Sequence, residues 1–141
     1  MIYLLDTNVA SELLKSHPRI VARLETLDDG DVAEVPIVAW LEIVRGRTAS
    51  LLAAADEKEL LIAQSRLDHD LEAMKNIPIV GVNVEAARHF GSMLSHKKCR
   101  KMRRADMLIA CIALANRAVL VTRNVKDFAN VPGLTLQNWF E

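Results

Sequence analysis

Short apolar runs recur along the chain and are separated by longer segments with helical periodicity. The runs cover residues 2–5, 35–38, 77–82, 118–122 and 134–136. Each run is continuously apolar rather than alternating, a pattern typical of strands buried on both faces of a parallel sheet. We therefore expect five short strands in the interior of the protein.

The segments between these runs place apolar residues three or four positions apart, which indicates helices. They cover residues 9–15, 20–27, 40–47, about 51–74, 84–96 and 106–116. Strands that alternate with helices predict an α/β fold, a three-layer α/β/α sandwich around a mostly parallel central sheet of about five strands. We assign the apolar face of residues 51–74 to the core rather than to a contact with another protein.

Length and composition limit the classes of protein to which the chain can belong. It has 141 residues, 51% of them hydrophobic, which predicts a single domain over residues 1–141 with a sizeable core. No apolar run approaches the roughly 18 to 20 residues of a membrane span, and the first residues lack the basic region of a signal peptide. The cysteines, Cys99 and Cys111, have no metal-binding spacing and suit a reducing compartment. We expect a cytoplasmic protein.

Acidic and amide side chains stand next to several of the apolar segments. The residues are Asp6, Glu42, Asp106, Asn124 and Asp127. A carboxylate at the edge of a buried segment costs free energy unless something compensates its charge. Several converging carboxylates are most often compensated by a hard divalent cation with oxygen ligands. The pattern therefore predicts a metal-dependent enzyme, provided that the fold brings these residues together.

Each acid also has a purely structural explanation. Asp6 would cap the helix that follows it, and Glu42 would pair with Arg45 on a helix surface. Asp106 would interact favourably with the N-terminus of its own helix. The polar residues that follow the run 118–122 would form an ordinary turn. Local sequence leaves both explanations open at every position.

Positive charge is concentrated in one segment, although the net charge of the chain is zero. Six of the eight residues from 97 to 104 are basic, which leaves 12 basic and 18 acidic residues elsewhere. The basic residues are Lys97, Lys98, Arg100, Lys101, Arg103 and Arg104. The segment is either a solvated loop or a surface that binds RNA phosphates beside Asp106.

Four segments resemble those of the PIN-domain nucleases and stand in the same order. They are LLDTNV at 4–9, Glu42 with Gly46 four residues later, DMLIAC at 106–111, and VTRNVKDF at 121–128. More narrowly, the chain is similar to the VapC-type ribonuclease toxins of bacterial type II toxin–antitoxin pairs. The resemblance extends over the whole chain, and the length is typical of these toxins.

The resemblance implies a PIN-like fold and endonucleolytic cleavage of RNA with the help of Mg²⁺ or Mn²⁺. It makes Asp6, Glu42 and Asp106 the metal ligands. Asn124 stands where many relatives have Asp, so we assign it a weak or water-mediated contribution, with Asp127 just outside the ligand shell. The residues that would support the acids are Thr7, Asn8 and Thr122.

Two departures from the family pattern are visible. Relatives often carry Ser or Thr one helical turn before the glutamate, where this chain has Val38 and Ala39, so a supporting hydroxyl group is in doubt. The segment before Asp106 reads Met-Arg-Arg-Ala rather than being rich in Gly or Pro. This second departure indicates an individual way of binding RNA or a partner.

The resemblance also implies partners. A VapB-like protein antitoxin would wrap its C-terminal segment around the helices near residues 9–27 and 40–52, and the toxin would form a homodimer. Two other functions compete with the nuclease. One is a PIN-like module that binds RNA or protein without catalysis, and the other is a phosphoryl-transfer protein whose nucleophile is Asp6. The second needs another Asp two residues after Asp6, where the chain has Asn8.

Overall fold

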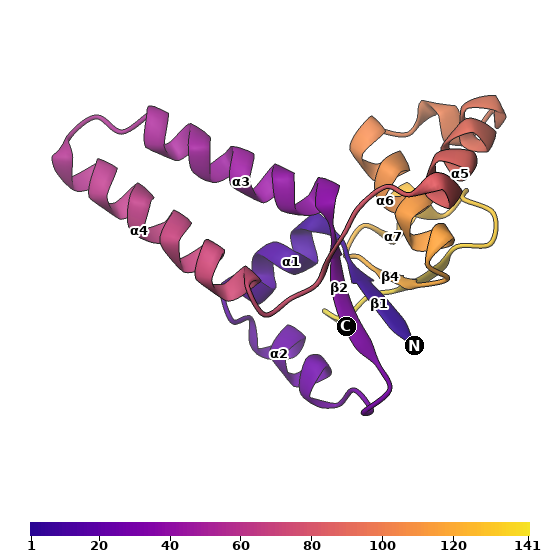
Figure 1. The fold of residues 1–141 in the computed structure, drawn as a ribbon, viewed down its shortest axis with the longest axis horizontal. Coiled ribbons are helices and arrows are strands. Elements are labelled where there is room, and N and C mark those ends of the chain that lie inside the picture. The colour runs from indigo at the N-terminus through magenta and orange to yellow at the C-terminus, as the bar shows by residue number, and fades with distance from the viewer.

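A five-stranded parallel sheet forms the centre of the protein, in a computed structural model that describes all 141 residues (Figure 1). Its strands are β1 Ile2–Leu5, β2 Val32–Pro36, β3 Ile79–Val80, β4 Val119–Val121 and β5 Thr135–Gln137. Their spatial order is β3-β2-β1-β4-β5, and every neighbouring pair is parallel. The predicted sheet is confirmed, and β1 lies at its centre.

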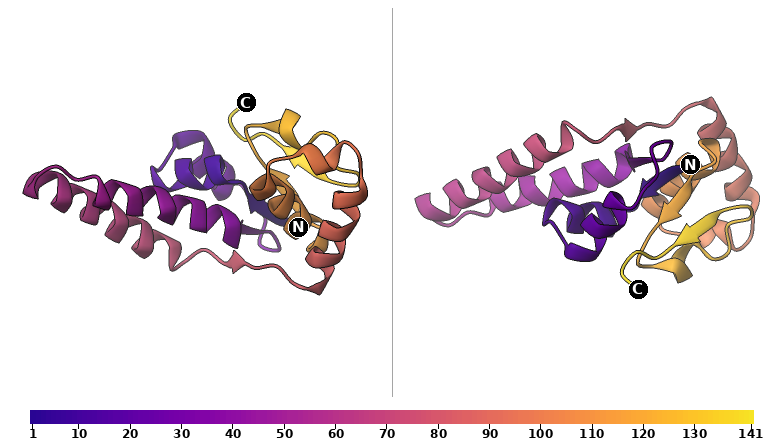
Figure 2. Two further views of the ribbon diagram at one scale, coloured as in Figure 1. Left: turned by 90° about the horizontal axis from the view of Figure 1, so that it is seen from above. Right: turned by 90° about the horizontal axis from the view of Figure 1, so that it is seen from below.

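Seven α-helices and one short 3-10 helix surround the sheet. They are α1 Thr7–Leu14, α2 Pro18–Glu25, α3 Ile37–Leu52, α4 Glu57–Met74, α5 Val84–Ser95, η1 Cys99–Lys101, α6 Arg104–Ala115 and α7 Val125–Phe128. The chain adds β2 and β3 on one side of β1, then returns to add β4 and β5 on the other. Because such crossovers are right-handed, the helices before and after β3 cover opposite faces, which confirms the α/β/α sandwich (Figures 1 and 2).

The reversal of direction between β1 and β4 determines where a ligand can bind. In parallel sheets, ligands occupy the crevice beyond the carboxyl ends of the strands at the point where the strand order reverses. Asp6 and Thr122 directly follow β1 and β4, so both lie at this crevice. Helix α6 approaches it with an apolar body, because six of its residues are buried in the core.

Several element boundaries differ from those predicted. The expected strand 35–38 ends at Pro36, and α3 begins at Ile37 and continues through Gly46 to Leu52. Residues 35–44 are apolar almost throughout, and such a run does not distinguish a buried strand from a buried helix. The expected strand 77–82 shortens to Ile79–Val80, because Pro78 before it has no amide hydrogen to donate.

Helices α3 and α4 form a hairpin that projects from the sheet (Figures 1 and 2). The assignment of the apolar face of residues 51–74 to the core is wrong for most of this segment. Only Ala63, Asp70 and Met74 of α4 are buried, whereas Leu61 is 70% exposed and Leu52 is 84% exposed. The hairpin extends beyond the sheet, so its tip has no core to cover. No helix of the protein combines the length and apolar character that crossing a membrane requires.

A buried ion pair fastens this hairpin near its base. The Arg47 Nε of α3 donates a hydrogen bond to Asp70 Oδ2 of α4 over 2.5 Å, and Asp70 is 1% exposed. Asp70 shares the inner side of α4 with Ala63 and Met74. Its other carboxylate oxygen has no partner. The Asp70 charge therefore depends on Arg47 alone.

Replacing Arg47 should destabilise the fold, because the Asp70 carboxylate would remain buried without its counter-charge. We expect Arg47→Met to lower the free energy of unfolding by about 3 kcal/mol, measured by urea denaturation. The exposed Arg45 provides the control, and Arg45→Met should change stability by less than about 0.5 kcal/mol. Most of the loss should return in the Arg47→Met/Asp70→Leu double variant. Equal stability of the Arg47→Met and Arg45→Met variants would contradict this account.

Candidate active site

Asp6 lies at the end of the central strand and is almost completely buried, with 4% of its surface exposed. Its Oδ1 accepts a hydrogen bond from the Thr7 amide over 2.8 Å, and its Oδ2 accepts one from the Thr122 hydroxyl over 2.7 Å. The first bond makes Asp6 the N-cap of α1. Asp6 therefore caps α1 and lies at the crevice at the same time. The hydrogen bond from Thr122 connects the end of β4 to the same carboxylate.

Burial is the main influence on the ionisation of Asp6. Desolvation raises the pKa of Asp6 above its ordinary value, and the negative charges of Asp106 and Glu42 raise it further. The hydrogen bonds from Thr122 and Thr7 act in the opposite direction and stabilise the carboxylate. The influence of Asp106 and Glu42 shows that three acids from distant parts of the sequence interact here.

Glu42 extends from the second turn of α3 toward α1. The Thr7 hydroxyl donates a hydrogen bond to Glu42 Oε1 over 2.8 Å. Thr7 thereby supplies the supporting hydroxyl group that the sequence lacks at Val38 and Ala39. The alternative pair with Arg45 does not form, because the partner of Glu42 Oε2 is Arg103 Nη1 at 2.9 Å.

Asp106 lies in the first turn of α6 and shares the same arginine. Arg103 Nη2 donates to Asp106 Oδ1 over 2.9 Å, and Arg103 Nε donates to Oδ2 over 3.4 Å. The guanidinium group thus bridges α3 and α6 through Glu42 and Asp106. Both carboxylates raise the pKa of Arg103 above its ordinary value, so Arg103 stays charged.

The remaining predicted positions lie at the edge of this cluster. Asn124 is exposed, and its backbone amide donates a hydrogen bond to the Thr122 hydroxyl over 3.0 Å. Asp127 is also exposed but lines a cavity together with Asp106 and Arg103. Asn8 forms no hydrogen bond with the acids, and its side-chain oxygen accepts one from the Arg123 backbone amide over 3.3 Å. The bond from Asn8 holds the loop after β4 against α1.

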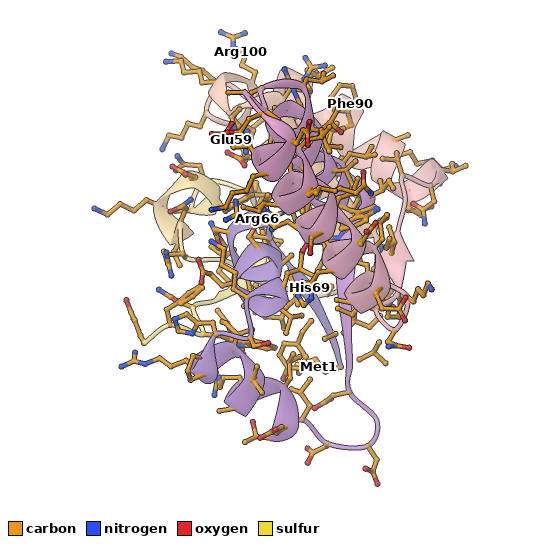
Figure 3. The ribbon with its side chains drawn as sticks, turned by 90° about the vertical axis from the view of Figure 1, so that its left-hand side faces the viewer. Met1, Glu59, Arg66, His69, Phe90 and Arg100 are labelled. Carbon is orange, nitrogen blue, oxygen red and sulfur yellow. The ribbon has the colours of Figure 1, made fainter.

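The basic segment forms one wall of the site. Lys98, Lys101 and Arg103 line a cavity of about 430 Å³ that also contains Asp106 and Asp127. Arg100 points away from the body of the protein (Figure 3), and the Arg104 guanidinium lies 4.9 Å from the centre of the Phe90 ring. The predicted basic residues therefore divide into those that face the acids and those that face outward.

A second cavity, of about 310 Å³, lies on the other side of Glu42 between α1 and α3. Its lining includes Thr7, Lys15, Glu42 and Arg47. The two cavities flank the acidic cluster, each with cationic side chains in its wall. Sequence reasoning missed Lys15, which caps the C-terminal end of α1 and so lies about two helical turns away from Asp6 at the other end of the same helix.

The chemistry of the acidic cluster fits a hard divalent ion, because Asp6, Glu42 and Asp106 offer only carboxylate oxygens. The present side-chain arrangement does not itself enclose an ion. No three acidic, His or Cys side chains converge closely enough to hold a metal together. The Arg103 guanidinium stands between two of the acids, as the cation of the site. The sequence places Arg103 among the basic residues predicted to bind RNA phosphates. In the structure it pairs with Glu42 and also with Asp106, three residues later in the chain.

Comparisons of the sequence and of the fold with known proteins lead to the same group of relatives. The sequence matches the PIN domain over residues 3–134. It is 29% identical to Ribonuclease VapC1 of Haemophilus influenzae strain R2866, over 99% of this chain and 98% of that protein. The fold is similar to VapBC-1 from nontypeable Haemophilus influenzae, with a TM-score of 0.83, 26% identity and 100% coverage of both chains. It is also similar to VapBC2 from Rickettsia felis bound to a promoter DNA fragment, with a TM-score of 0.80, 27% identity and 99% coverage of both.

The buried charge of Asp6 should lower stability at neutral pH in the absence of divalent ions. Because the folded-state pKa of Asp6 lies above 3.8, the folded protein binds this proton more tightly than the unfolded chain. The contribution of Asp6 to stability therefore falls as the pH rises from about 3.8 through the folded-state pKa. We expect Asp6→Asn to be more stable than the wild type at pH 7 in EDTA, with the difference shrinking toward pH 4.

Urea denaturation at several pH values would measure this difference. Asp127→Asn is the matched control, because Asp127 is exposed and its replacement should leave the pH profile unchanged. A less stable Asp6→Asn variant at pH 7 in EDTA would contradict the explanation by desolvation.

Proposed function

The chain belongs to the PIN domain family, and we propose that it is a metal-dependent endoribonuclease that acts as the toxin of a toxin–antitoxin pair. One observation carries the proposal. Asp6 after β1, Glu42 of α3 and Asp106 of α6 lie near one another at the carboxyl edge of the sheet, beside a wall of cationic side chains. Carboxylates that bind metal next to cations that bind phosphate are what hydrolysis of a phosphodiester requires.

Asp6, Glu42 and Asp106 would hold one or two Mg²⁺ or Mn²⁺ ions. The bound ion would lower the pKa of a water ligand and neutralise charge on the phosphoryl group. Thr122 and Thr7 fix the orientation of Asp6 and Glu42 through their hydrogen bonds. For the fourth position, the place of Asp127 in the cavity beside Asp106 supports Asp127, whereas Asn124 is the position that aligns with the family.

The basic segment would bind the RNA backbone. Lys98 and Lys101 face the acids, and Lys97 and Arg100 extend the positive surface outward. Phosphate contacts of this kind position a nucleic acid without reading its sequence. The chain has only six aromatic residues, and Phe128 and Trp139 are buried. Recognition would therefore depend on the shape of the RNA more than on stacking of its bases.

Protein partners would complete the function. The similarity to VapC1 and to the two VapBC structures supports a VapB-like antitoxin as a partner in the cytoplasm. The hairpin of α3 and α4 exposes apolar side chains that suit a protein contact, with the antitoxin or with a second copy in a homodimer. These side chains are Leu52, Leu60, Leu61, Ile62 and Leu71.

Cleavage of RNA should require a divalent ion and the three acids. We expect wild-type protein to cut structured RNA with Mg²⁺ or Mn²⁺ but not with EDTA. Asp6→Ala and Asp106→Ala should each lower the rate by at least about a hundredfold, the loss typical when transition-state charge stabilisation is removed. Comparing Asn124→Ala with Asp127→Ala would identify the fourth position. The nuclease proposal fails if the wild type binds RNA without cutting it, or if both alanine variants of the acids cut at full rate.

RNA affinity should depend on salt through the basic segment. Replacing Lys97, Lys98, Arg100 and Lys101 with Gln should reduce the slope of log affinity against log salt by about 2 to 3, because each lost phosphate contact contributes about 0.7 for single strands. Filter binding with the non-cleaving Asp106→Ala background would give the slopes. Lys58 and Arg66, exposed on α4, are the control pair, and their replacement should leave the slope unchanged. An unchanged slope in the quadruple variant would exclude this role for the segment.

A further inference from the structure

Arg103 has the contacts of a counter-ion for the acidic cluster. Its guanidinium forms one ion pair with Glu42 over 2.9 Å and one with Asp106 over 2.9 Å, across 61 residues of sequence in the first case. Asp106 uses both carboxylate oxygens in this contact. Of the two Glu42 oxygens, one accepts from Thr7 and the other from Arg103. Neither acid has both oxygens free for another cation while Arg103 is in place.

The position of Arg103 also permits it to leave. It is the residue immediately before α6, and its carbonyl accepts a hydrogen bond from the Met107 amide, so the backbone can stay fixed while the side chain rotates. Its side chain is 59% exposed, in contrast to the buried Asp6 beneath it. An arginine side chain is long and flexible, and exposed ion pairs of this kind contribute little net free energy. Arg103 therefore orders Glu42 and Asp106 through its hydrogen bonds, and its replacement by another cation costs little free energy.

We propose that Arg103 is a built-in counter-ion of the acidic site, which holds Glu42 and Asp106 together in the metal-free protein and is displaced when a divalent ion binds. This inference rests on the proposed metal site. In the metal-free protein, Arg103 reduces the repulsion between the acids of three separate elements. It thereby keeps the ligands close to each other, and at the same time it competes with the metal for two of them. The released guanidinium would lie next to Lys98 and Lys101, where RNA phosphates are expected.

Binding of Mn²⁺ alone, measured by calorimetry, tests the competition without reference to activity. We expect Arg103→Gln to bind Mn²⁺ about five- to tenfold more tightly than the wild type, the effect of removing a competing ion pair. Lys101→Gln is the matched control for this affinity. Lys101 lines the same cavity beside Asp106, so its replacement removes an equal charge without removing the bridge. Lys101→Gln should therefore increase affinity by clearly less than Arg103→Gln.

The metal-free protein provides a second and opposite readout. Without Mn²⁺, the thermal midpoint of Arg103→Gln should lie about 3 °C below that of the wild type, because Glu42 and Asp106 lose the positive charge that reduces their repulsion. Saturating Mn²⁺ should restore the midpoint to that of the wild type. The Arg103→Lys variant keeps the charge without the bridging fork and should lie between the two in both measurements. A merely structural role for Arg103 would lower stability and metal affinity together.

The outcomes separate this inference from the nuclease proposal. Tighter Mn²⁺ binding by Arg103→Gln, together with a wild type that binds Mn²⁺ but does not cut RNA, would support the counter-ion and overturn the nuclease. Metal-dependent cutting by the wild type, with equal or weaker Mn²⁺ binding by folded Arg103→Gln, would overturn the counter-ion and leave the nuclease standing. Absence of Mn²⁺ binding by both proteins would overturn the two together.

Discussion

Mutual repulsion of negative charges at the edge of the sheet is the constraint on which the rest of the site depends. Asp6 follows β1, Glu42 belongs to α3 and Asp106 belongs to α6, and both neighbouring acids disfavour ionisation of Asp6. Each acid has a group that opposes this repulsion: Thr122 for Asp6, Thr7 for Glu42, and Arg103 for the outer pair. The apolar body of α6 and the central position of β1 supply the rigidity that keeps these groups in place.

The parallel sheet and the place of Asp6 at its carboxyl edge could be predicted because their signals are local. Continuous apolar runs predict strands buried on both faces, and a carboxylate directly after such a run has few positions other than the carboxyl edge of a sheet. Element ends were less predictable, since the run that contains Pro36 is equally apolar in β2 and in α3. The exposed face of α4 could not be predicted, because periodicity shows that a helix has an apolar face but not what covers it.

Local sequence could not predict the contacts that complete the site, because their partners lie far apart in the chain. Thr7 supports Glu42 across 35 residues, and Arg103 reaches Glu42 across 61. Only the fold determines such neighbours. Val38 and Ala39 offer Glu42 no hydroxyl group, and Thr7 at the start of α1 supplies one, whereas the hydroxyl that orients Asp6 comes from Thr122 directly after β4.

The hydrogen bond between Thr122 and Asp6 has a consequence for biosynthesis, because 116 residues separate its partners. At translation rates of about 5–20 residues per second, about 6 to 23 s pass between the synthesis of Asp6 and that of Thr122. During this interval β4 is absent, so the central strand lacks one neighbour and Asp6 lacks its strongest hydrogen-bond donor. A site that depends on this bond cannot be complete before Thr122 has been synthesised and β4 has paired with β1. The order of the strands delays assembly of the site until most of the chain has been made.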